Sequence, residues 1–92
     1  MGLLDGKVVV VTGGGHGIGR AYCMGIAREG GTAVVADIDD KAADGVAKAI
    51  ADKGGKALAT KVDVANLSSC QEMAAKALGA YGQIDGLINN AA

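Results

Sequence analysis

The chain has 92 residues, half of them hydrophobic, which is enough for one small domain with a single core and too few for two. Nine lysine and arginine residues oppose ten aspartate and glutamate residues, and only two residues are aromatic. This composition argues against a nucleic-acid-binding or membrane-binding surface. Because no apolar run reaches the roughly 18 residues that cross a bilayer, and no secretory signal precedes the first predicted strand, we expect a cytoplasmic location.

The first predicted strand covers residues 8–11, four consecutive valines that Thr12 ends. A short β-branched run that is apolar at every position is typical of a strand buried on both faces of a parallel sheet. It leads into residues 13–19, where five of the seven residues are glycine. Glycine allows positive φ angles and lets the backbone approach a ligand without an intervening Cβ atom. Such a loop between a strand and a helix predicts a phosphate-binding site.

The spacing of the glycines separates the known kinds of phosphate-binding loop. The dinucleotide-binding pattern G-x-G-x-x-G is absent, because its last glycine would fall on Ile18 or Arg20. A P-loop is nearly matched, but Arg20 replaces its lysine and Ala21 lacks the hydroxyl that binds magnesium. The pattern present is Thr12-Gly13-x-x-x-Gly17-Ile18-Gly19. A flexible glycine loop that holds no ligand is the alternative.

The first predicted helix runs from about Ile18 to Glu29, because its apolar residues recur at spacings of three and four. We expect Gly19 and Gly25 to be tolerated in this helix because it lies close to a strand. The buried stripe is predicted to contain Ile18, Ala21, Tyr22, Gly25 and Ile26.

Two more helices are predicted in the same way. The second runs from Lys41 to Asp52, capped by the pair Asp39-Asp40, and the third starts at a capping box of Ser69 and Glu72. The predicted stripe of the second contains Ala43, Val46, Ala47 and Ile50, and that of the third contains Met73, Ala74, Ala77 and Leu78.

Three further strands, residues 32–36, 56–62 and 86–89, alternate with these helices. This order predicts a Rossmann-like α/β fold with a doubly wound parallel sheet, right-handed crossovers and strand order 3-2-1-4. Ligands bind such a sheet at the carboxyl ends of its strands, where the winding reverses. The glycine loop, Asp37, Asp63 and the pair Asn89-Asn90 each follow a predicted strand, so we expect them to meet at one edge.

Asp37 follows Gly19 by 18 residues, near the roughly 20 expected for the carboxylate that binds an adenosine ribose. A loop or helix-capping aspartate is the alternative interpretation. Ile38 comes next, where proteins that use NADP have an arginine for its 2′-phosphate. We therefore expect NAD rather than NADP, because a mostly neutral His16 and a distant Arg20, although either could reach a phosphate, should not outweigh the adjacent carboxylate.

These motifs together resemble the short-chain dehydrogenase/reductase family, through residues 12–19, Asp63-Val64 and Asn89-Asn90-Ala91-Ala92. The resemblance implies that Asp63 and Val64 hold adenine, that Asn90 contacts the cofactor, and that Asn89 braces the sheet. The family usually has glycine at the position of Ala92. The implied cofactor is NAD, with no metal, and the implied cofactor-binding residues are Gly13, Gly15, His16, Gly17, Ile18, Gly19, Asp37, Ile38, Asp63, Val64, Asn90 and Ala91.

The catalytic residues of that family are not found in this sequence. The family uses a serine and a Tyr-x-x-x-Lys motif later in the chain, whereas here Tyr22 is followed at that distance by Ile26 and Tyr81 by Asp85. We interpret Ser68 and Ser69 as helix caps, and we expect Cys23 and Cys70 to be buried reduced thiols. Residues 1–92 are therefore expected to form the N-terminal NAD-binding part of a single Rossmann-fold domain, without the catalytic remainder.

The leading hypothesis is an NAD-dependent oxidoreductase parent that transfers hydride between nicotinamide and a small alcohol or ketone. A narrower hypothesis is 3-oxoacyl-[acyl-carrier-protein] reductase, and the resemblance also implies a homotetramer. The alternatives are a non-catalytic nucleotide-binding module and a structural protein with an empty glycine loop. Because strand 86–89 would be an open edge, we expect the isolated chain to aggregate or to be partly molten.

Overall fold

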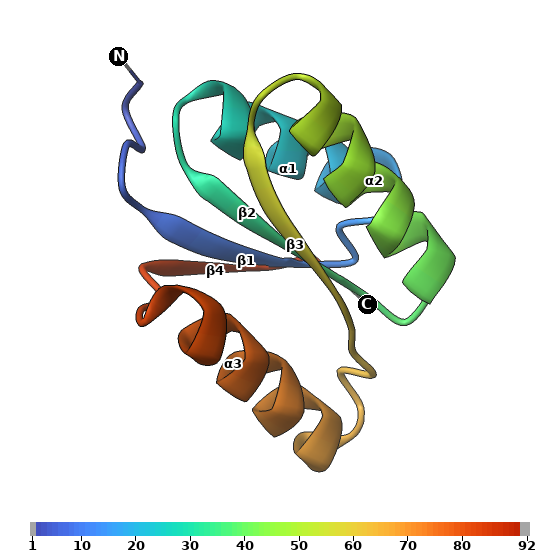
Figure 1. The fold of residues 1–92 in the computed structure, drawn as a ribbon. Helices are drawn as coiled ribbons and strands as arrows, with labels where there is room; N and C mark the ends of the chain where they lie inside the picture. Colours follow the sequence, from blue (N-terminus) through green and yellow to red (C-terminus); the bar gives the residue numbers. More distant parts are fainter. Residues whose placement is uncertain (1, 91–92) are drawn as a thin grey trace.

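The computed structural model describes residues 2–90, which form a sheet between two layers of helices (Figure 1). Its four strands are all parallel and lie in the order β3-β2-β1-β4. This arrangement confirms the predicted Rossmann-like fold and its strand order. The elements are β1 (Val8–Thr12), α1 (Gly17–Arg28), β2 (Thr32–Asp37), α2 (Asp40–Asp52), β3 (Lys56–Lys61), α3 (Leu67–Tyr81) and β4 (Gly86–Asn89).

Strand β1 is buried on both faces, as its run of valines predicts. Successive side chains of a strand point to opposite faces, so Val9 and Val11 pack in one cluster and Val8 and Val10 in another. Figure 1 shows α1 and α2 on the first of these faces and α3 on the second. The helices on both faces cover the sheet, and because its strands are all parallel, their carboxyl ends lie along the same edge.

The predicted stripe of α1 is confirmed at Ile26 and in part at Gly25, which is half-buried, and is wrong at Ile18, Ala21 and Tyr22. The residues that α1 buries are Gly19, Cys23 and Ile26, whereas the side chain of Ile18 is 65% exposed and that of Tyr22 is 44% exposed. Tyrosine and isoleucine suggested a buried stripe because of their size, but the helix uses small residues where it approaches the sheet. Burial raises the pKa of the Cys23 thiol to about 11, which keeps it protonated at neutral pH.

Gly19 and Gly25, both expected to let α1 approach a strand closely, have different surroundings. A Cβ atom on Gly19 would collide with the carbonyl oxygen of Gly13 and lie 2.7 Å from Asn90 Nδ2, so the close approach is confirmed there. A Cβ atom on Gly25 would meet nothing within 4 Å, so the same explanation is wrong for Gly25.

Helix α2 begins at Asp40, one residue before the predicted start, and Asp39 caps it as predicted, since its carboxylate accepts a hydrogen bond from the Ala42 N–H. Its predicted stripe is also confirmed, with Ala43, Val46 and Ile50 buried and Ala47 partly buried. The chain turns at Gly54, in the positive φ that glycine favours, and enters β3.

The predicted capping box of α3 is wrong. The helix begins at Leu67 and is capped by Asn66, whose side chain accepts from the Ser69 N–H. Ser69 lies inside the first turn, and its hydroxyl instead accepts from the Asp63 N–H. Met73 and Ala77 are buried as predicted, but Leu78 is largely exposed, and Cys70 is only partly buried.

Strand β4 forms one edge of the sheet, and the Leu87 side chain is 61% exposed. Its first residue follows Asp85, whose carboxylate accepts from the Val8 N–H at 2.7 Å and from Gln83 Nε2 at 2.6 Å. These bonds join β4 to the start of β1. None of the helices within residues 2–90 has the length and apolar character needed to cross a membrane.

Candidate functional site

The carboxyl edge of the sheet contains a cavity of about 160 Å³ between the ends of β1, β2 and β3. Five residues predicted from the sequence to bind a cofactor line it: Gly13, Asp37, Ile38, Asp63 and Val64. Val62 and Ala65 complete the lining. Residues from three separate loops thus meet at one place, as the topology of a parallel sheet requires.

Asp37 lies at the centre of this edge, and its side chain is almost fully buried, with 6% exposure. One carboxylate oxygen accepts from the Gly15 N–H at 3.0 Å, and the other accepts from the Asp39 N–H at 3.0 Å. A carboxylate has about four lone-pair sites, so each oxygen can still accept a further hydrogen bond. Asp37 can therefore brace the glycine loop and bind hydroxyl groups of a ligand at the same time.

The glycine loop has the shape that its composition predicts. Gly13 and Gly17 have φ values of 69° and 52°, in the region that side chains disfavour. A Cβ atom on Gly15 would lie 2.9 Å from Asp37 Oδ2 and 2.7 Å from the Ala42 Cβ atom. The loop is therefore packed against β2 and α2 on one side, whereas a Cβ atom on Gly17 would meet nothing within 4 Å.

The N-terminus of α1 differs from those of the other two helices. Asp39 and Asn66 cap α2 and α3 with their side chains, but His16 makes no such hydrogen bond at the start of α1. As in α3, the first turn of α1 contains no acidic residue, whereas α2 has Asp40 there. The first N–H groups of a helix have no partner within it, and the helix dipole makes that end positive. An anion placed against the glycine loop would meet these groups.

His16 instead contacts the loop that follows β2. Its Nε2 atom lies 3.1 Å from Asp39 Oδ2, and both side chains are exposed. The hydrogen bond from the Ala42 N–H, followed by the contact with His16, holds the pKa of Asp39 below its ordinary value of 3.8. Together with Asp37, this contact fastens the glycine loop to the start of α2.

The end of β4 is tied to the end of β1 through Thr12. The Thr12 hydroxyl lies 3.2 Å from Asn89 Oδ1, to which it can donate, and it accepts from the Asn90 N–H at 3.0 Å. Asn90 Nδ2 also lies 3.4 Å from the Gly13 carbonyl oxygen. The predicted bracing by Asn89 is present, and Asn90 shares it. Ala91 and Ala92 lie outside the described residues.

The loop after β3 places Asp63 and Val64 at the mouth of the cavity. Asp63 Oδ1 accepts from the Ala65 N–H at 3.0 Å, which closes a tight turn, and the Ser69 hydroxyl holds the Asp63 backbone. Val64 and Ile38 are both exposed apolar side chains at the cavity. They provide an apolar rim on which a flat ring could lie.

Sequence reasoning missed three residues that shape this site, Thr12, Asp39 and Ser69, in the bracing roles they have here. Thr12 and Asp39 act through contacts with residues 77 and 23 positions away, which no local pattern signals, and Ser69 bonds the Asp63 N–H six residues before it. Arg20, considered as a phosphate ligand, is exposed on the first turn of α1. Among residues 2–90, no three or more His, Cys, Asp and Glu residues form a group that could hold a metal ion.

Comparison with known proteins identifies the class to which this fold and edge belong. The family model described as short chain dehydrogenase matches residues 7–92. The chain is 43% identical over 89 residues to a 2,5-dichloro-2,5-cyclohexadiene-1,4-diol dehydrogenase of Sphingobium indicum, covering 97% of this chain and 34% of that protein. It is 41% identical to a hydroxyacyl-CoA dehydrogenase of Mycobacterium tuberculosis, covering 96% of this chain and 29% of that protein.

Solved structures agree with this class. A hydroxysteroid dehydrogenase from Escherichia coli superposes with a TM-score of 0.94 at 37% identity, covering 97% of this chain and 38% of the other. A short chain dehydrogenase/reductase from Burkholderia phymatum, in complex with NAD, gives 0.89 at 36% identity, covering 95% and 31%. The chain therefore belongs to the short-chain dehydrogenase/reductase family. It spans about a third of the length of these relatives.

Proposed function

We propose that residues 1–92 are the NAD-binding part of an oxidoreductase that transfers hydride between nicotinamide and a small alcohol or ketone. The observation that carries this proposal is the pair of hydrogen bonds from the Gly15 and Asp39 N–H groups to the buried Asp37 carboxylate. They hold a negative charge at the carboxyl edge beside a glycine loop and an uncapped helix N-terminus. Family membership and a relative solved with NAD support the same cofactor.

The residues at the edge fit the parts of NAD. The N–H groups at the start of α1 and the open side of Gly17 suit a pyrophosphate, because no side chain of the described residues caps that helix end. Asp37 has lone pairs free for both adenosine ribose hydroxyls. Ile38, Asp63 and Val64 line the cavity into which adenine would enter, Asp63 as a hydrogen-bond acceptor and the other two as apolar contacts.

Bound NAD would supply the hydride acceptor, and the chain's own residues would hold it in place. Gly13, Gly15 and Gly19 set the path of the loop, and His16 and Ile18 flank it on the open side. Asn90, held against Gly13, lies at the end of β4 nearest to the start of α1 and is the proposed contact for the nicotinamide side. Ala91 follows Asn90 and is proposed to share this contact.

The substrate class comes from the family alone. The narrower proposal is that the parent is a 3-oxoacyl-[acyl-carrier-protein] reductase. We also propose that the parent is a homotetramer and is located in the cytoplasm. No Tyr-x-x-x-Lys motif occurs in the 92 residues, so the proton donor for the reaction must come from elsewhere in the parent. A non-catalytic NAD-binding module is the second candidate, because the edge residues that fit NAD would serve such a module equally well.

The direct test is absorbance at the reduced-nicotinamide band. The intact protein, mixed with NAD and a panel of secondary alcohols, should produce reduced cofactor, and Asp37→Ala should weaken this activity. The isolated 92-residue chain should give no signal above background. Tight NAD binding by the intact protein without turnover of any panel member would favour the module, and no NAD binding would reject both.

A further inference from the structure

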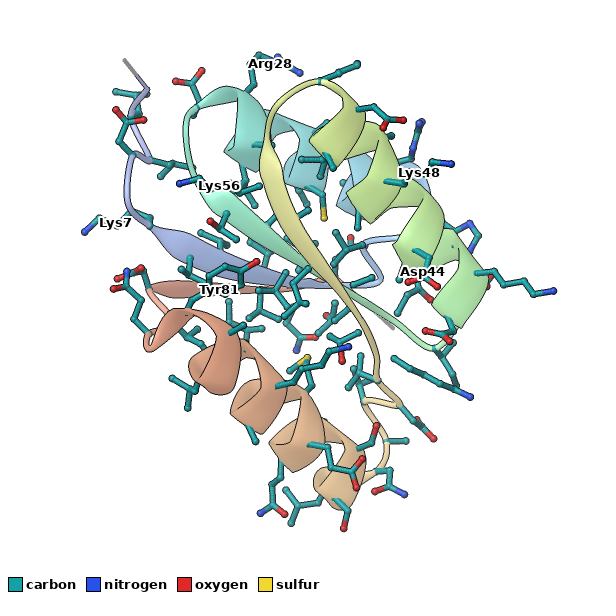
Figure 2. All side chains as sticks on the ribbon, in the orientation of Figure 1. Lys7, Arg28, Asp44, Lys48, Lys56 and Tyr81 are labelled. Carbon is teal, nitrogen blue, oxygen red and sulfur yellow. The ribbon has the colours of Figure 1, made fainter. Side chains whose placement is uncertain are left out.

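A second cavity lies away from the cofactor edge, where α1 and α2 end. It encloses about 300 Å³. Met24, Ala27 and Ile50 contribute apolar side chains to it, and Arg28 and Lys53 contribute cations. Figure 2 shows Arg28 at the end of the molecule where α1 and α2 both finish, whereas the glycine loop lies at the opposite end of these helices.

The apolar side chains of Met24, Ala27 and Ile50 form the floor of the cavity, and the turn that follows α2 packs against α1 and α2 through Gly55. A Cβ atom on Gly55 would lie 2.8 Å from Ile50 Cγ2 and 3.2 Å from the Ala27 Cβ atom. The close approach of the turn backbone therefore depends on Gly55, and no side chain from the turn fills the space. This pocket is open to solvent, and its volume near 300 Å³ is at the lower end of the range for small-molecule sites, so it admits a short hydrocarbon chain.

The two charged residues that line this cavity, Arg28 and Lys53, are both cations. None of its lining residues is acidic, and within residues 2–90 the one ion pair is His16–Asp39, so Arg28 and Lys53 have no carboxylate partner there. The neighbouring Glu29 is used elsewhere, since Oε1 accepts from the Leu3 N–H. Two unpaired cations beside an apolar floor are complementary to a ligand with an anionic head and a hydrocarbon tail.

The ends of α1 and α2 could oppose an anion, because a helix C-terminus carries partial negative charge. The relevant carbonyl groups are already engaged, however. Ala27 O accepts from the Gly30 N–H at 3.1 Å, and Ile50 O accepts from the Lys53 and Gly55 N–H groups at 3.1 and 3.0 Å. These bonds reduce the exposed negative charge, whereas the two side-chain cations remain accessible.

We infer that this cavity, defined by Met24, Ala27, Arg28, Ile50 and Lys53, is a second binding site for a small aliphatic monocarboxylate. It is separate from the cofactor edge and does not depend on the proposed oxidoreductase function. The hydrocarbon tail contacts Met24 and Ala27 above the buried Ile50, and the carboxylate contacts the Arg28 guanidinium and the Lys53 ammonium group. A ligand at this position joins the ends of α1 and α2.

The experiment is calorimetric titration of the intact protein with octanoate, with saturating NAD present and again without it. One variant, Arg28→Gln/Lys53→Gln, removes both cations from exposed positions, and a second, Ala27→Leu, fills the space. The control Lys41→Gln/Lys48→Gln removes the same charge from exposed positions on α2 that do not line the cavity. Octanol is the uncharged probe of the same length.

We expect saturable octanoate binding at one site, weakened about tenfold or more by Arg28→Gln/Lys53→Gln and by Ala27→Leu, and unchanged by the control. NAD should not alter the affinity. The inference is overturned if octanoate does not bind, if all variants bind it equally, or if the control weakens binding as much as the cavity variants. Octanol binding as tight as octanoate binding would also overturn it, because the two cations would then have no role.

Discussion

The Asp37 carboxylate accepts a hydrogen bond from the Gly15 N–H at 3.0 Å, across 22 residues of sequence. This bond joins the glycine loop to the end of β2, and the packing around it leaves no room for a side chain at Gly15. The same carboxylate is the proposed ribose ligand. The position of the glycine loop and the position of the Asp37 carboxylate, which the ribose would contact, therefore depend on each other.

Gly15→Ala tests this dependence. The added methyl group would lie 2.7 Å from the Ala42 Cβ atom and 2.9 Å from Asp37 Oδ2, so the loop or α2 must move. Overpacking of this kind costs about 1–3 kcal/mol, and we expect that loss in the free energy of unfolding together with weaker NAD binding. Denaturant unfolding and calorimetry on the intact protein measure both. Unchanged NAD affinity in Gly15→Ala would show that the position of the glycine loop does not affect cofactor binding.

Gly45→Ala is the matched control and should have the opposite effect on stability. Gly45 lies inside α2, and a Cβ atom there would meet nothing within 4 Å. Alanine loses less backbone entropy than glycine on folding, so we expect stabilisation by about 0.5–1 kcal/mol. Denaturant unfolding should show a higher midpoint with an unchanged slope. A destabilised Gly45→Ala protein would show that the packing around α2 is tighter than described.

The sequence predicted the elements of this fold well because their signals are local. Four consecutive valines, a glycine loop and an aspartate at the end of a strand each determine a short segment. The stripe of α1 was predicted wrongly because Ile18 and Tyr22 are apolar at helical spacing but lie beyond the area that the sheet covers in residues 2–90. The start of α3 was misplaced because Asn66 and Ser69 are both good capping residues, and only the geometry of the preceding loop favours Asn66.

Within the site, the sequence predicted the residues but not their internal bonds. Asp37, Asp63 and the Asn89-Asn90 pair follow strands, and parallel topology alone brings them to one edge. The contacts of His16 with Asp39 and of Thr12 with Asn89 join residues 23 and 77 positions apart, respectively. Hydrogen bonds between residues so far apart in sequence depend on how the strands pair and twist, and the spacing of residues in a motif does not predict this.

Acid should destabilise the protein partly through Asp85. Hydrogen bonds from the Val8 N–H and from Gln83 hold the pKa of this carboxyl below its ordinary value of 3.8. Since the pKa is lower in the folded state, this contribution is present at pH values above the unfolded pKa and is lost as the pH falls through the folded pKa. Asp85→Asn should make stability less dependent on pH below about 4. Asp44→Asn, at an exposed position on α2, is the control, and identical acid profiles for the two variants would refute this role.

The exposed strand β4 should make the isolated 92-residue chain prone to association. Leu87 is 61% exposed on an unpaired edge, and such edges pair readily with other chains. We expect the isolated chain to aggregate or to be partly molten, and Leu87→Lys to reduce its light scattering. Leu67→Lys changes a leucine on α3 that is more exposed, at 73%, but does not lie on a strand edge, and it should have less effect. A soluble monomer of the unsubstituted chain with a sharp two-state melt would contradict this expectation.

The central claim is that Asp37 selects NAD over NADP. The 2′-phosphate of NADP carries about 1.5–2 negative charges, and each unit about 4 Å from a carboxylate costs on the order of 4 kcal/mol at an effective dielectric constant near 20. Solvent screening and movement of the ribose reduce this cost. The contact between His16 and Asp39 also places the His16 ring beside another carboxylate.

The most direct measurement is the ratio of the NADP and NAD dissociation constants, obtained by calorimetry on the intact protein and on Asp37→Ala, with Asp44→Ala as the control. We predict a preference for NAD of at least about a hundredfold, equivalent to about 2.7 kcal/mol, that Asp37→Ala largely abolishes and Asp44→Ala retains. Equal affinity for the two cofactors in the unsubstituted protein, or an unchanged preference in Asp37→Ala, would contradict the account.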